Sequence, residues 1–431
     1  MTFAKVQLKR LVDPARPITY GIVQAGPDTP GGIPYIRPVD MTPYSGIAAS
    51  ASLLRTTPEI SAAYRRSTVA EGDVVVSIGP SYGKVMVVNG DLAGANLTQG
   101  TARVAPAPGV HNRFLYWALQ SSEARQHWDS CVGGATFRAL NLEPLGRTPV
   151  PLVPLDDQRR IADFLDAETA RIDKMCLAMR RLKVLLQERS GAQRSLILRG
   201  AEKLGARTLH PMLGDLPASW RVIPLKRLVP RVGVGVVVDP SSYFTEEGVP
   251  FLRGSNITEA GVDLTGVRFM SEADSRSLWR SRLNSGDVVV IRAGYPGRAA
   301  VVPDYLDGAN CASLLVIKKG KHLLPEYLEA YFNSPLGTAY VNSVRYGAAQ
   351  EQINVSHVVD FMVPVPGLQE QESIVRKLEL SDKPIQALRE KLSRQEVLLT
   401  ERRQALITAA VTGQFDVSTA SGRNVTEGVS V

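Results

Sequence analysis

PLVPLDDQRRIADFLDAETARIDKMCLAMRRLKVLLQERSGAQRSLILRG, residues 151–200, reads as a proline-bounded stop followed by one long helix. Apolar residues recur in it at alternating spacings of four and three, which is typical of a helix that packs along another helix. Gly200, a residue type that commonly ends helices, closes the stretch. The residues predicted to form this helix seam are Ile161, Leu165, Ile172, Met175, Met179, Leu182 and Leu186.

The pattern appears a second time in PVPGLQEQESIVRKLELSDKPIQALREKLSRQEVLLTERRQALITAAVTG, residues 364–413, displaced by 213 residues. A single apolar stripe indicates an ordinary core helix. Two like helices, neither able to bury its stripe alone, are natural partners for each other. We therefore expect a coiled coil of two antiparallel helices. The second set of seam residues is Ile374, Leu378, Ile385, Leu388, Leu392 and Leu399.

Pro384 conflicts with a simple helix in the second copy. Proline removes an amide donor and clashes with the preceding helical turn. We expect a kink or a break at 381–383, with the main helix restarting at Pro384. The first copy has Arg171 at the equivalent position and should be straighter.

The chain outside these helices is also duplicated, as a first globule at 1–152 and a second globule at 221–364. Short β-type runs between Gly and Pro residues, followed by a helical piece, predict a mixed α/β fold for each. The expected fold class is therefore α/β (α+β), with two similar globules separated by two long helices in a pseudo-two-fold repeat. The repeated segments include LKRLV (8–12 and 225–229) and GDVVV (72–76 and 286–290).

The remaining boundaries follow from composition. The long helices are expected at 153–200 and 365–413, and residues 201–220 form a linker that contains Pro211, Gly214 and Pro217. Residues 414–431 are rich in Ser, Thr and Gly without an apolar period, and we expect them to be disordered.

Charge and cysteine usage exclude several classes of protein. The formal net charge of +8 permits a polyanionic partner without proving one. Three scattered cysteines indicate neither a disulfide framework nor a zinc site, which fits a cytoplasmic protein. The first residues show no apolar h-region and no run approaches about 18 apolar residues, so we expect neither a signal peptide nor a membrane span.

Motifs for catalysis are missing from the sequence. It contains no Gly-x-x-x-x-Gly-Lys-Ser/Thr phosphate loop, no Asn/Asp-Pro-Pro-Tyr-type methyl-transfer loop and no Gly-x-Ser-x-Gly elbow. The five histidines show no metal-ligand spacing. We therefore expect no catalytic residue, no metal and no cofactor bound by this chain.

Two helices of roughly 40 residues would form a spacer of about 60 Å. A spacer that holds two similar but non-identical globules could present two readers to neighbouring segments of one DNA duplex. The globules differ most in their loops, so we expect them to read different sequences.

The duplicated order resembles that of specificity subunits of type I restriction–modification systems. The resemblance rests on PLDDQRRIADFL (154–165) and PGLQEQESIVRKL (366–378), each with a glutamine before a long helix, on the GDVVV elements, and on the order globule, helix, globule, helix. It covers the whole chain except the tail. The first copy has Asp-Asp-Gln where the family usually has Glu-Gln.

This resemblance implies a non-catalytic subunit with two target-recognition domains, each reading half of a bipartite, asymmetric site in double-stranded DNA. It also implies that the helices dock methyltransferase subunits, of which we expect two, and that restriction/translocase subunits join through them. S-adenosylmethionine, ATP and Mg would belong to these partners. The alternatives are a coiled-coil adaptor without DNA binding, a free-standing restriction or methyltransferase polypeptide, and the specificity part of another such system.

The best candidates for DNA contact are two equivalent glycine-opened loops, GPSYGKV (79–85) and AGYPGRA (293–299), which place Lys84 over Arg298. A cation on such a loop suits a phosphate oxygen or a guanine edge. A tight turn with a solvated charge explains the pattern equally well. Arg37 and Arg253 also align, and a surface arginine beside a core strand is again an even alternative. The lower-ranked candidates are Tyr82, Arg138, Arg292, Tyr295, Tyr346 and Gln350.

Overall fold

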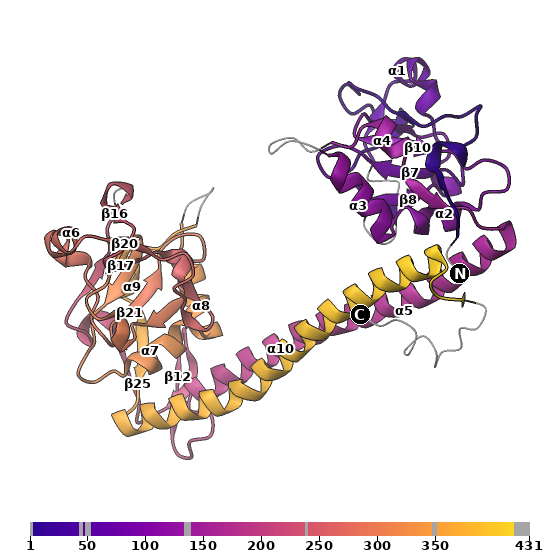
Figure 1. Cartoon of the computed structure of the whole chain (residues 1–431). Coiled ribbons are helices and arrows are strands. Elements are labelled where there is room, and N and C mark those ends of the chain that lie inside the picture. The colour runs from indigo at the N-terminus through magenta and orange to yellow at the C-terminus, as the bar shows by residue number, and fades with distance from the viewer. Residues whose placement is uncertain are drawn as a thin grey trace. The chain divides into compact units, whose positions relative to one another are not determined.

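The computed structural model describes residues 3–42, 46–47, 53–132, 139–237, 240–346 and 351–417. The chain divides into two compact units (Figure 1). Unit 1 comprises residues 1–180 and 393–431, and unit 2 comprises residues 181–392. Each unit therefore contains one globule together with half of each long helix, and unit 1 is assembled from both ends of the chain.

The globule of unit 1 is built on a four-stranded antiparallel sheet in the order β2-β10-β7-β8. A second sheet, β6-β3-β9, joins β3 to β9 in parallel, and β1 pairs with β11 just before the first long helix. The strands are β1 (Lys5–Gln7), β2 (Thr19–Tyr20), β3 (Ile33–Ile36), β4 (Met41–Thr42), β5 (Gly46–Ile47), β6 (Arg55–Thr56), β7 (Val74–Ser77), β8 (Val85–Val87), β9 (Asn96–Leu97), β10 (Thr101–Val104) and β11 (Pro149–Pro151). The helices are α1 (Pro58–Ala63), α2 (Asn112–Ala118), α3 (Ser122–Cys131) and α4 (Leu142–Gly146).

The globule of unit 2 repeats this topology. Its four-stranded sheet has the order β15-β24-β21-β22, β17 pairs in parallel with β23, and β14 pairs with β25 before the second long helix. The strands are β14 (Arg221–Pro224), β15 (Val232–Val234), β16 (Phe244–Thr245), β17 (Val249–Leu252), β18 (Ile257–Thr258), β19 (Gly261–Val262), β20 (Arg268–Met270), β21 (Val288–Ile291), β22 (Ala299–Val301), β23 (Asn310–Cys311), β24 (Leu314–Ile317) and β25 (Met362–Val365). The helices are α6 (Glu272–Ser277), α7 (Pro325–Phe332), α8 (Pro335–Val344) and α9 (Val355–Val359). The duplication predicted from the sequence is thus present in the fold.

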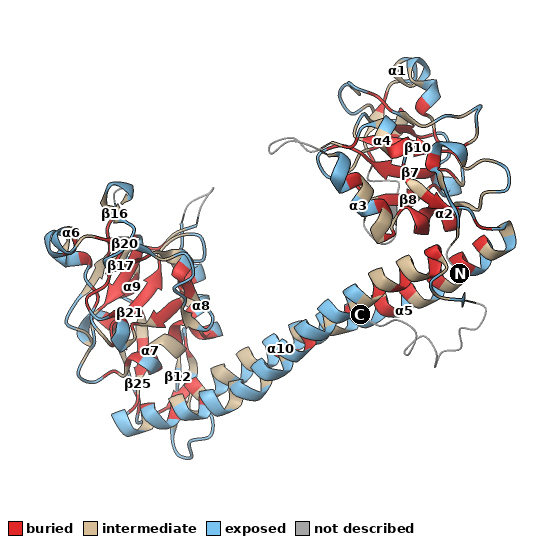
Figure 2. Cartoon of the chain, in the orientation of Figure 1, coloured by how far each residue is buried: buried red, intermediate tan, exposed pale blue. Residues whose placement is uncertain are grey.

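The GDVVV segments become the central strands β7 and β21, whose residues are all buried (Figure 2). Val74 and Val76 pack in the core shared with α2, whereas Val75 points to the opposite face and packs with Ile36 and Leu97. Successive side chains of a strand point to opposite faces, so a strand covered on both faces needs a continuous apolar run. The same segments therefore occupy the same two-sided position in both units.

A buried glutamine joins each globule to the start of its long helix. In unit 1, the side-chain oxygen of Gln158 accepts a 2.8 Å hydrogen bond from the His111 amide, and its Nε2 donates to the carbonyls of Gly109 and Val153 at 3.4 and 2.8 Å. Both atoms of the amide group are therefore satisfied, and the loop before α2 is fixed to the first turn of α5 (Leu155–Leu198).

Unit 2 repeats this contact 213 residues later. The oxygen of Gln371 accepts from the Leu324 amide at 2.8 Å, and its Nε2 donates to the carbonyls of His322 and Pro366 at 3.0 and 2.9 Å. Gln371 lies in the first turn of α10 (Leu368–Thr412) and is fully buried. This glutamine, which carries the family resemblance in the sequence, has a structural role in both copies.

The halves of α5 and α10 lie antiparallel within each unit. In unit 1, Arg180 is paired with Glu396, Asp173 with Arg403 at 3.3 Å, and Leu165 shares a core with Leu406. In unit 2, Arg194 and Ser190 both contact Asp382, at 3.1 and 2.9 Å. Residue numbers thus rise on one helix as they fall on the other, as expected for antiparallel packing.

Three predicted seam residues are wrong, because Met175, Leu182 and Leu388 are 40–44% exposed. The buried stripe runs from Ile172 to Cys176 and then to Met179. The residue that follows Ile172 in the seam is therefore four positions later, at Cys176, and not three positions later, at Met175. On α10 the same register buries Arg403 and half-buries Glu396. The remaining predicted positions, Ile161, Leu165, Ile172, Leu186, Ile374, Leu378 and Leu392, are buried, and Met179, Ile385 and Leu399 are half-buried.

The expected restart of the helix at Pro384 is also wrong, because α10 runs without interruption from Leu368 to Thr412. Pro384 and Leu380 are both exposed. The carbonyl of Leu380, which loses its helical donor to the proline, therefore lies on the face where water can replace the missing bond.

The segment 201–220 is structured, contrary to the expected linker. It contains the hairpin of β12 (Arg207–His210) and β13 (Gly214–Pro217), and Leu213, Leu216 and Trp220 pack in the core of unit 2 with Leu198. In the tail, Phe415 packs on Phe164 with ring centroids 5.5 Å apart. The predicted disorder beyond residue 417 concerns residues outside the described part of the chain.

We expect Gln158→Ala to lower the free energy of unfolding by about 2–3 kcal/mol, because it leaves a buried amide and two carbonyls without partners. The exposed Gln187→Ala on the same helix is the matched control and should change it by less than about 0.5 kcal/mol. Denaturant unfolding measures both values. Equal effects of the two substitutions would show that the Gln158 contact does not stabilise the unit.

Glu329 on α7 makes unit 2 sensitive to pH. Burial raises the pKa of its carboxyl to about 7, and Arg194 on α5 only partly offsets this shift. The folded state therefore holds the proton more tightly than the unfolded chain, so the free energy of unfolding should decrease as pH rises from about 4.5 to about 7 and then level off.

Glu329→Gln should remove this decrease and stabilise the protein at about pH 8, because the uncharged amide carries no cost of burying a charge. The exposed Glu379→Gln should leave the pH dependence unchanged. Thermal unfolding across this pH range distinguishes the two variants. An identical slope in wild-type protein and Glu329→Gln would exclude Glu329 as the titrating group.

Candidate nucleic-acid interface

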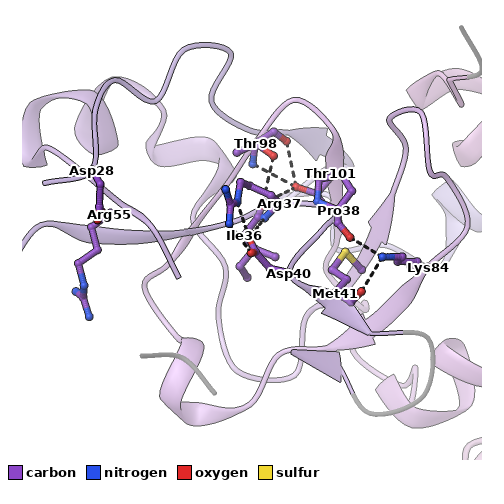
Figure 3. Close-up of polar contacts among 10 residues, drawn as sticks. All are labelled: Asp28, Ile36, Arg37, Pro38, Asp40, Met41, Arg55, Lys84, Thr98 and Thr101. Carbon is purple, nitrogen blue, oxygen red and sulfur yellow. Dashed lines mark hydrogen bonds and ion pairs between the residues drawn. The ribbon is translucent and has the colours of Figure 1, made fainter. Parts of the chain in front are cut away.

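A tight turn follows β3 in unit 1 and carries Arg37 (Figure 3). The amide of Asp40 donates to the carbonyl of Arg37 at 3.0 Å, and the carboxylate of Asp40 accepts from the Arg37 amide at 2.9 Å. The same carboxylate holds the guanidinium through Nε at 2.9 Å and Nη2 at 2.7 Å. These hydrogen bonds raise the pKa of Arg37, whose charge is matched inside the turn.

The equivalent turn follows β17 in unit 2, with Asn256 in the place of Asp40. The Asn256 amide donates to the Arg253 carbonyl at 2.9 Å, and its side-chain oxygen accepts from the Arg253 amide at 3.0 Å. The Arg253 guanidinium donates one long bond of 3.4 Å to the carbonyl of Gly266, and its Nε is buried without a partner. Among the described residues, no carboxylate pairs with Arg253.

Each of the two glycine-opened loops contains a glycine with a positive φ directly before the predicted cation. Gly83 and Gly297 have φ values of 90° and 94°, a region that favours glycine, and each precedes the predicted cation. A Cβ at Gly83 would lie 2.6 Å from Arg125, and one at Gly297 would lie 2.7 Å from Val341. Conformation therefore favours glycine at both positions, and at Gly297 a Cβ would also displace the branched side chain of Val341, whereas at Gly83 it would meet only the flexible end of Arg125.

Lys84 points back onto the turn of Arg37 (Figure 3). Its Nζ donates to the carbonyls of Pro38 and Met41, both at 2.9 Å. Two of the three ammonium donors are thus used inside the globule, and Lys84 fixes the turn beside its own loop. Contact of Lys84 with DNA stays a prediction.

Arg298 contacts the segment that follows the equivalent turn, but more loosely. Its Nη2 lies 3.4 Å from Glu259 in the hairpin of β18 and β19, and its guanidinium lies 5.8 Å from the centre of the Tyr295 ring. The same Glu259 lies 3.8 Å from Arg389 on α10. Tyr295 is 76% exposed, so this loop presents an aromatic ring and a cation on the surface of unit 2.

Two further candidates lie beside the same loop of unit 2. Ala293 and Tyr346 both form bridges with Gln352, and Arg292 donates to the Asn354 side chain at 3.2 Å. Tyr346 is 41% exposed and packs edge-on against His357. Arg292, Tyr295 and Tyr346 are thus brought together by one group of loops.

The other candidates do not join these groups. Tyr82 donates a 2.8 Å hydrogen bond to Asp129 and packs against the core of unit 1. Arg138 and Gln350 lie outside the described residues. The sequence reasoning missed Asp40 and Asn256, although their equivalence follows from the alignment that pairs Arg37 with Arg253.

It also missed a cation–aromatic cluster in unit 2, where Arg231 and Arg280 lie 5.9 and 5.4 Å from the ring of Trp279, which is 60% exposed. A signal for it was available in the adjacent letters Trp-Arg at 279–280, but Arg231 is distant in the sequence.

The described residues contain no cluster of three or more His, Cys, Asp or Glu side chains that could hold a metal ion. Within the same residues, no helix is long and apolar enough to cross a membrane.

Comparison with known proteins shows that this chain is similar to proteins of type I restriction–modification systems. The family model for the type I restriction modification DNA specificity domain matches residues 24–175, which cover most of the first globule and the start of α5. A chain of a solved type I R-M system, described in terms of complex assembly and conformational transition, superposes with a TM-score of 0.71 over 96% of this chain and 98% of its own, at 19% identity. The expected fold of two mixed α/β globules with two long helices is confirmed.

Two individual relatives come from Escherichia coli. The EcoBI type I restriction enzyme specificity subunit is 24% identical over 297 residues, which are 66% of this chain and 62% of the relative. The EcoKI specificity subunit is 26% identical over 289 residues, which are 64% of this chain and 59% of the relative. The match thus spans about three fifths of each relative, and the resemblance to type I specificity subunits is confirmed.

We expect Lys84→Met to speed amide exchange at Arg37 and Asp40, because it removes two charge-assisted bonds to the turn and lowers its local opening free energy by about 2 kcal/mol. Arg298→Met should leave exchange at Arg253 and Asn256 nearly unchanged, since the surface pair with Glu259 contributes about 0–1 kcal/mol. Hydrogen exchange read by mass spectrometry or NMR measures both. Similar protection of the turn in Lys84→Met and wild-type protein would contradict the structural role of Lys84.

Proposed function

We propose that this chain is the DNA-specificity subunit of a type I restriction–modification complex, and that it is not itself catalytic. The observation that carries this proposal is that the two units share the order of their central four-stranded sheet and the parallel pair beside it, but carry different side chains on equivalent loops. Lys84 corresponds to Arg298, and Asp40 corresponds to Asn256. A duplicated scaffold with divergent loops suits the reading of two different DNA half-sites by one chain.

In this proposal each globule reads one half of an asymmetric, interrupted site in double-stranded DNA. The loops 79–85 and 293–299, with the turns beside them, would supply the contacts. Arg253 and Arg298 offer hydrogen-bond donors for phosphates and base edges, and Tyr295 offers an exposed aromatic surface. Which of these residues reads a base depends on the target sequence.

The long helices would dock two methyltransferase subunits. The duplicated segments VLLQER and VLLTER expose equivalent apolar pairs, Val184 with Leu185 and Val397 with Leu398, which are 51–59% exposed. Exposed apolar side chains at equivalent positions suit two copies of one partner. Restriction/translocase subunits would join through the methyltransferases, and S-adenosylmethionine, ATP and Mg would be bound by these partners.

The salt dependence of duplex binding tests this function directly. If the globules neutralise phosphates, the logarithm of the association constant should fall linearly with the logarithm of salt concentration, by about 0.9 per phosphate contacted. A coiled-coil adaptor would bind duplex DNA weakly or not at all at every salt concentration. S-adenosylmethionine binding by the isolated chain would contradict the non-catalytic assignment and indicate a free-standing methyltransferase.

A further inference from the structure

The two equivalent turns differ in one decisive side chain. Asp40 binds the Arg37 guanidinium with two charge-assisted hydrogen bonds, at 2.9 and 2.7 Å, in the bidentate geometry that suits an arginine–carboxylate pair. Asn256 cannot form such a pair, because its amide carries no charge and one of its two polar atoms is a donor.

The surroundings of Asn256 explain why the two residues are not interchangeable. Asn256 is 1% exposed, and its Nδ2 donates to the carbonyl of Asp263 at 2.9 Å while its Oδ1 accepts from the Arg253 amide. The amide thus fixes both the turn and the segment after the β18–β19 hairpin. A carboxylate at this position would face the Asp263 carbonyl without a proton to donate.

The difference between Asp40 and Asn256 changes the hydrogen bonds of the two turn arginines. Arg37 is held by its own turn, whereas the guanidinium of Arg253 makes one bond of 3.4 Å to the described residues, and its buried Nε has no partner among them. A guanidinium without a carboxylate keeps its charge and most of its five donors for an external anion. The two turns therefore carry equivalent arginines, of which Arg37 is bound within its own turn and Arg253 is available to an external anion.

We propose that the residue at position 40 or 256 determines how each globule uses its turn arginine: Asn256 leaves Arg253 to bind a DNA phosphate, whereas Asp40 keeps Arg37 as an internal support of its turn. This inference rests on the proposed DNA-binding function. It assigns Asp40 and Asn256 as positioning residues that act through the arginines.

The test uses the full chain and two synthetic duplexes, one carrying the sequence found methylated in cells and one with that sequence scrambled. Arg253→Ala should reduce the slope of log affinity against log salt by about 0.9, the contribution of one phosphate, and Arg37→Ala should leave the slope unchanged. Asp40→Asn should release Arg37 and increase the slope by about the same amount.

Two controls separate release of Arg37 from a general change of charge. Asp91→Asn removes a carboxylate from an exposed turn of the same globule and should not change the slope. Arg37→Ala added to Asp40→Asn should return the slope to the wild-type value.

Asn256→Asp should reduce the slope as Arg253→Ala does. If it fails to fold by circular dichroism, the Asp40→Asn series decides the question.

The outcomes are distinct. Equal losses of slope in Arg37→Ala and Arg253→Ala, or an effect of Asp40→Asn no larger than that of Asp91→Asn, would overturn the inference while leaving DNA binding intact. Loss of discrimination between the two duplexes in Arg253→Ala at an unchanged slope would also overturn it, because that result places Arg253 at a base edge. Absence of salt-dependent binding by the wild-type chain would instead contradict the proposed function.

Discussion

The attachment of each globule to its long helix depends on one buried glutamine side chain. Gln158 and Gln371 each satisfy a backbone amide and two carbonyls that lie at the junction of globule and helix. An unmade hydrogen bond in such a buried place is costly, so the junction tolerates few other side chains. The strands β11 and β25, which pair with β1 and β14, lead directly into this contact and fix the chain on its other side.

Polar and ionic groups define the packing of the long helices as much as apolar ones do. Unit 1 uses Asp173 with Arg403, and unit 2 uses Arg194 with Asp382. Such partly buried charge pairs contribute little net stability, but they disfavour a shifted register, because a shift would leave a charge without its partner. The two units thus share an architecture and differ in the chemistry of their helix contacts, as they do in their loops.

The duplication, the mixed α/β class and the central GDVVV strands could be predicted from the sequence, because each depends on repeated or continuous apolar patterns. The seam register could not, since Met175 and Leu182 are more apolar than the residues beside them, and only packing decides that Cys176 is buried in place of Met175. The β12–β13 hairpin was missed because its breakers, Pro211 and Gly214, also suit an unstructured connector.

For the candidate site, the sequence predicted which residues occupy equivalent positions but not which hydrogen bonds they make. The alignment of the two copies identified the loops and the arginines, but it could not show that the ammonium of Lys84 binds the carbonyls of Pro38 and Met41. It also could not show that Arg37 is paired with a carboxylate whereas Arg253, within the described part of the chain, is not, because that difference depends on the geometry of the turn and on the Asp263 carbonyl.

We propose that each globule independently reads half of a DNA site. Replacing residues 221–364 by the corresponding globule of a relative, and sequencing methylated adenines in cells that also contain the methyltransferase partner, tests it most directly. One half of the methylated sequence should change while the other half is retained. A methylated sequence that is unchanged, or that changes in both halves, would contradict it.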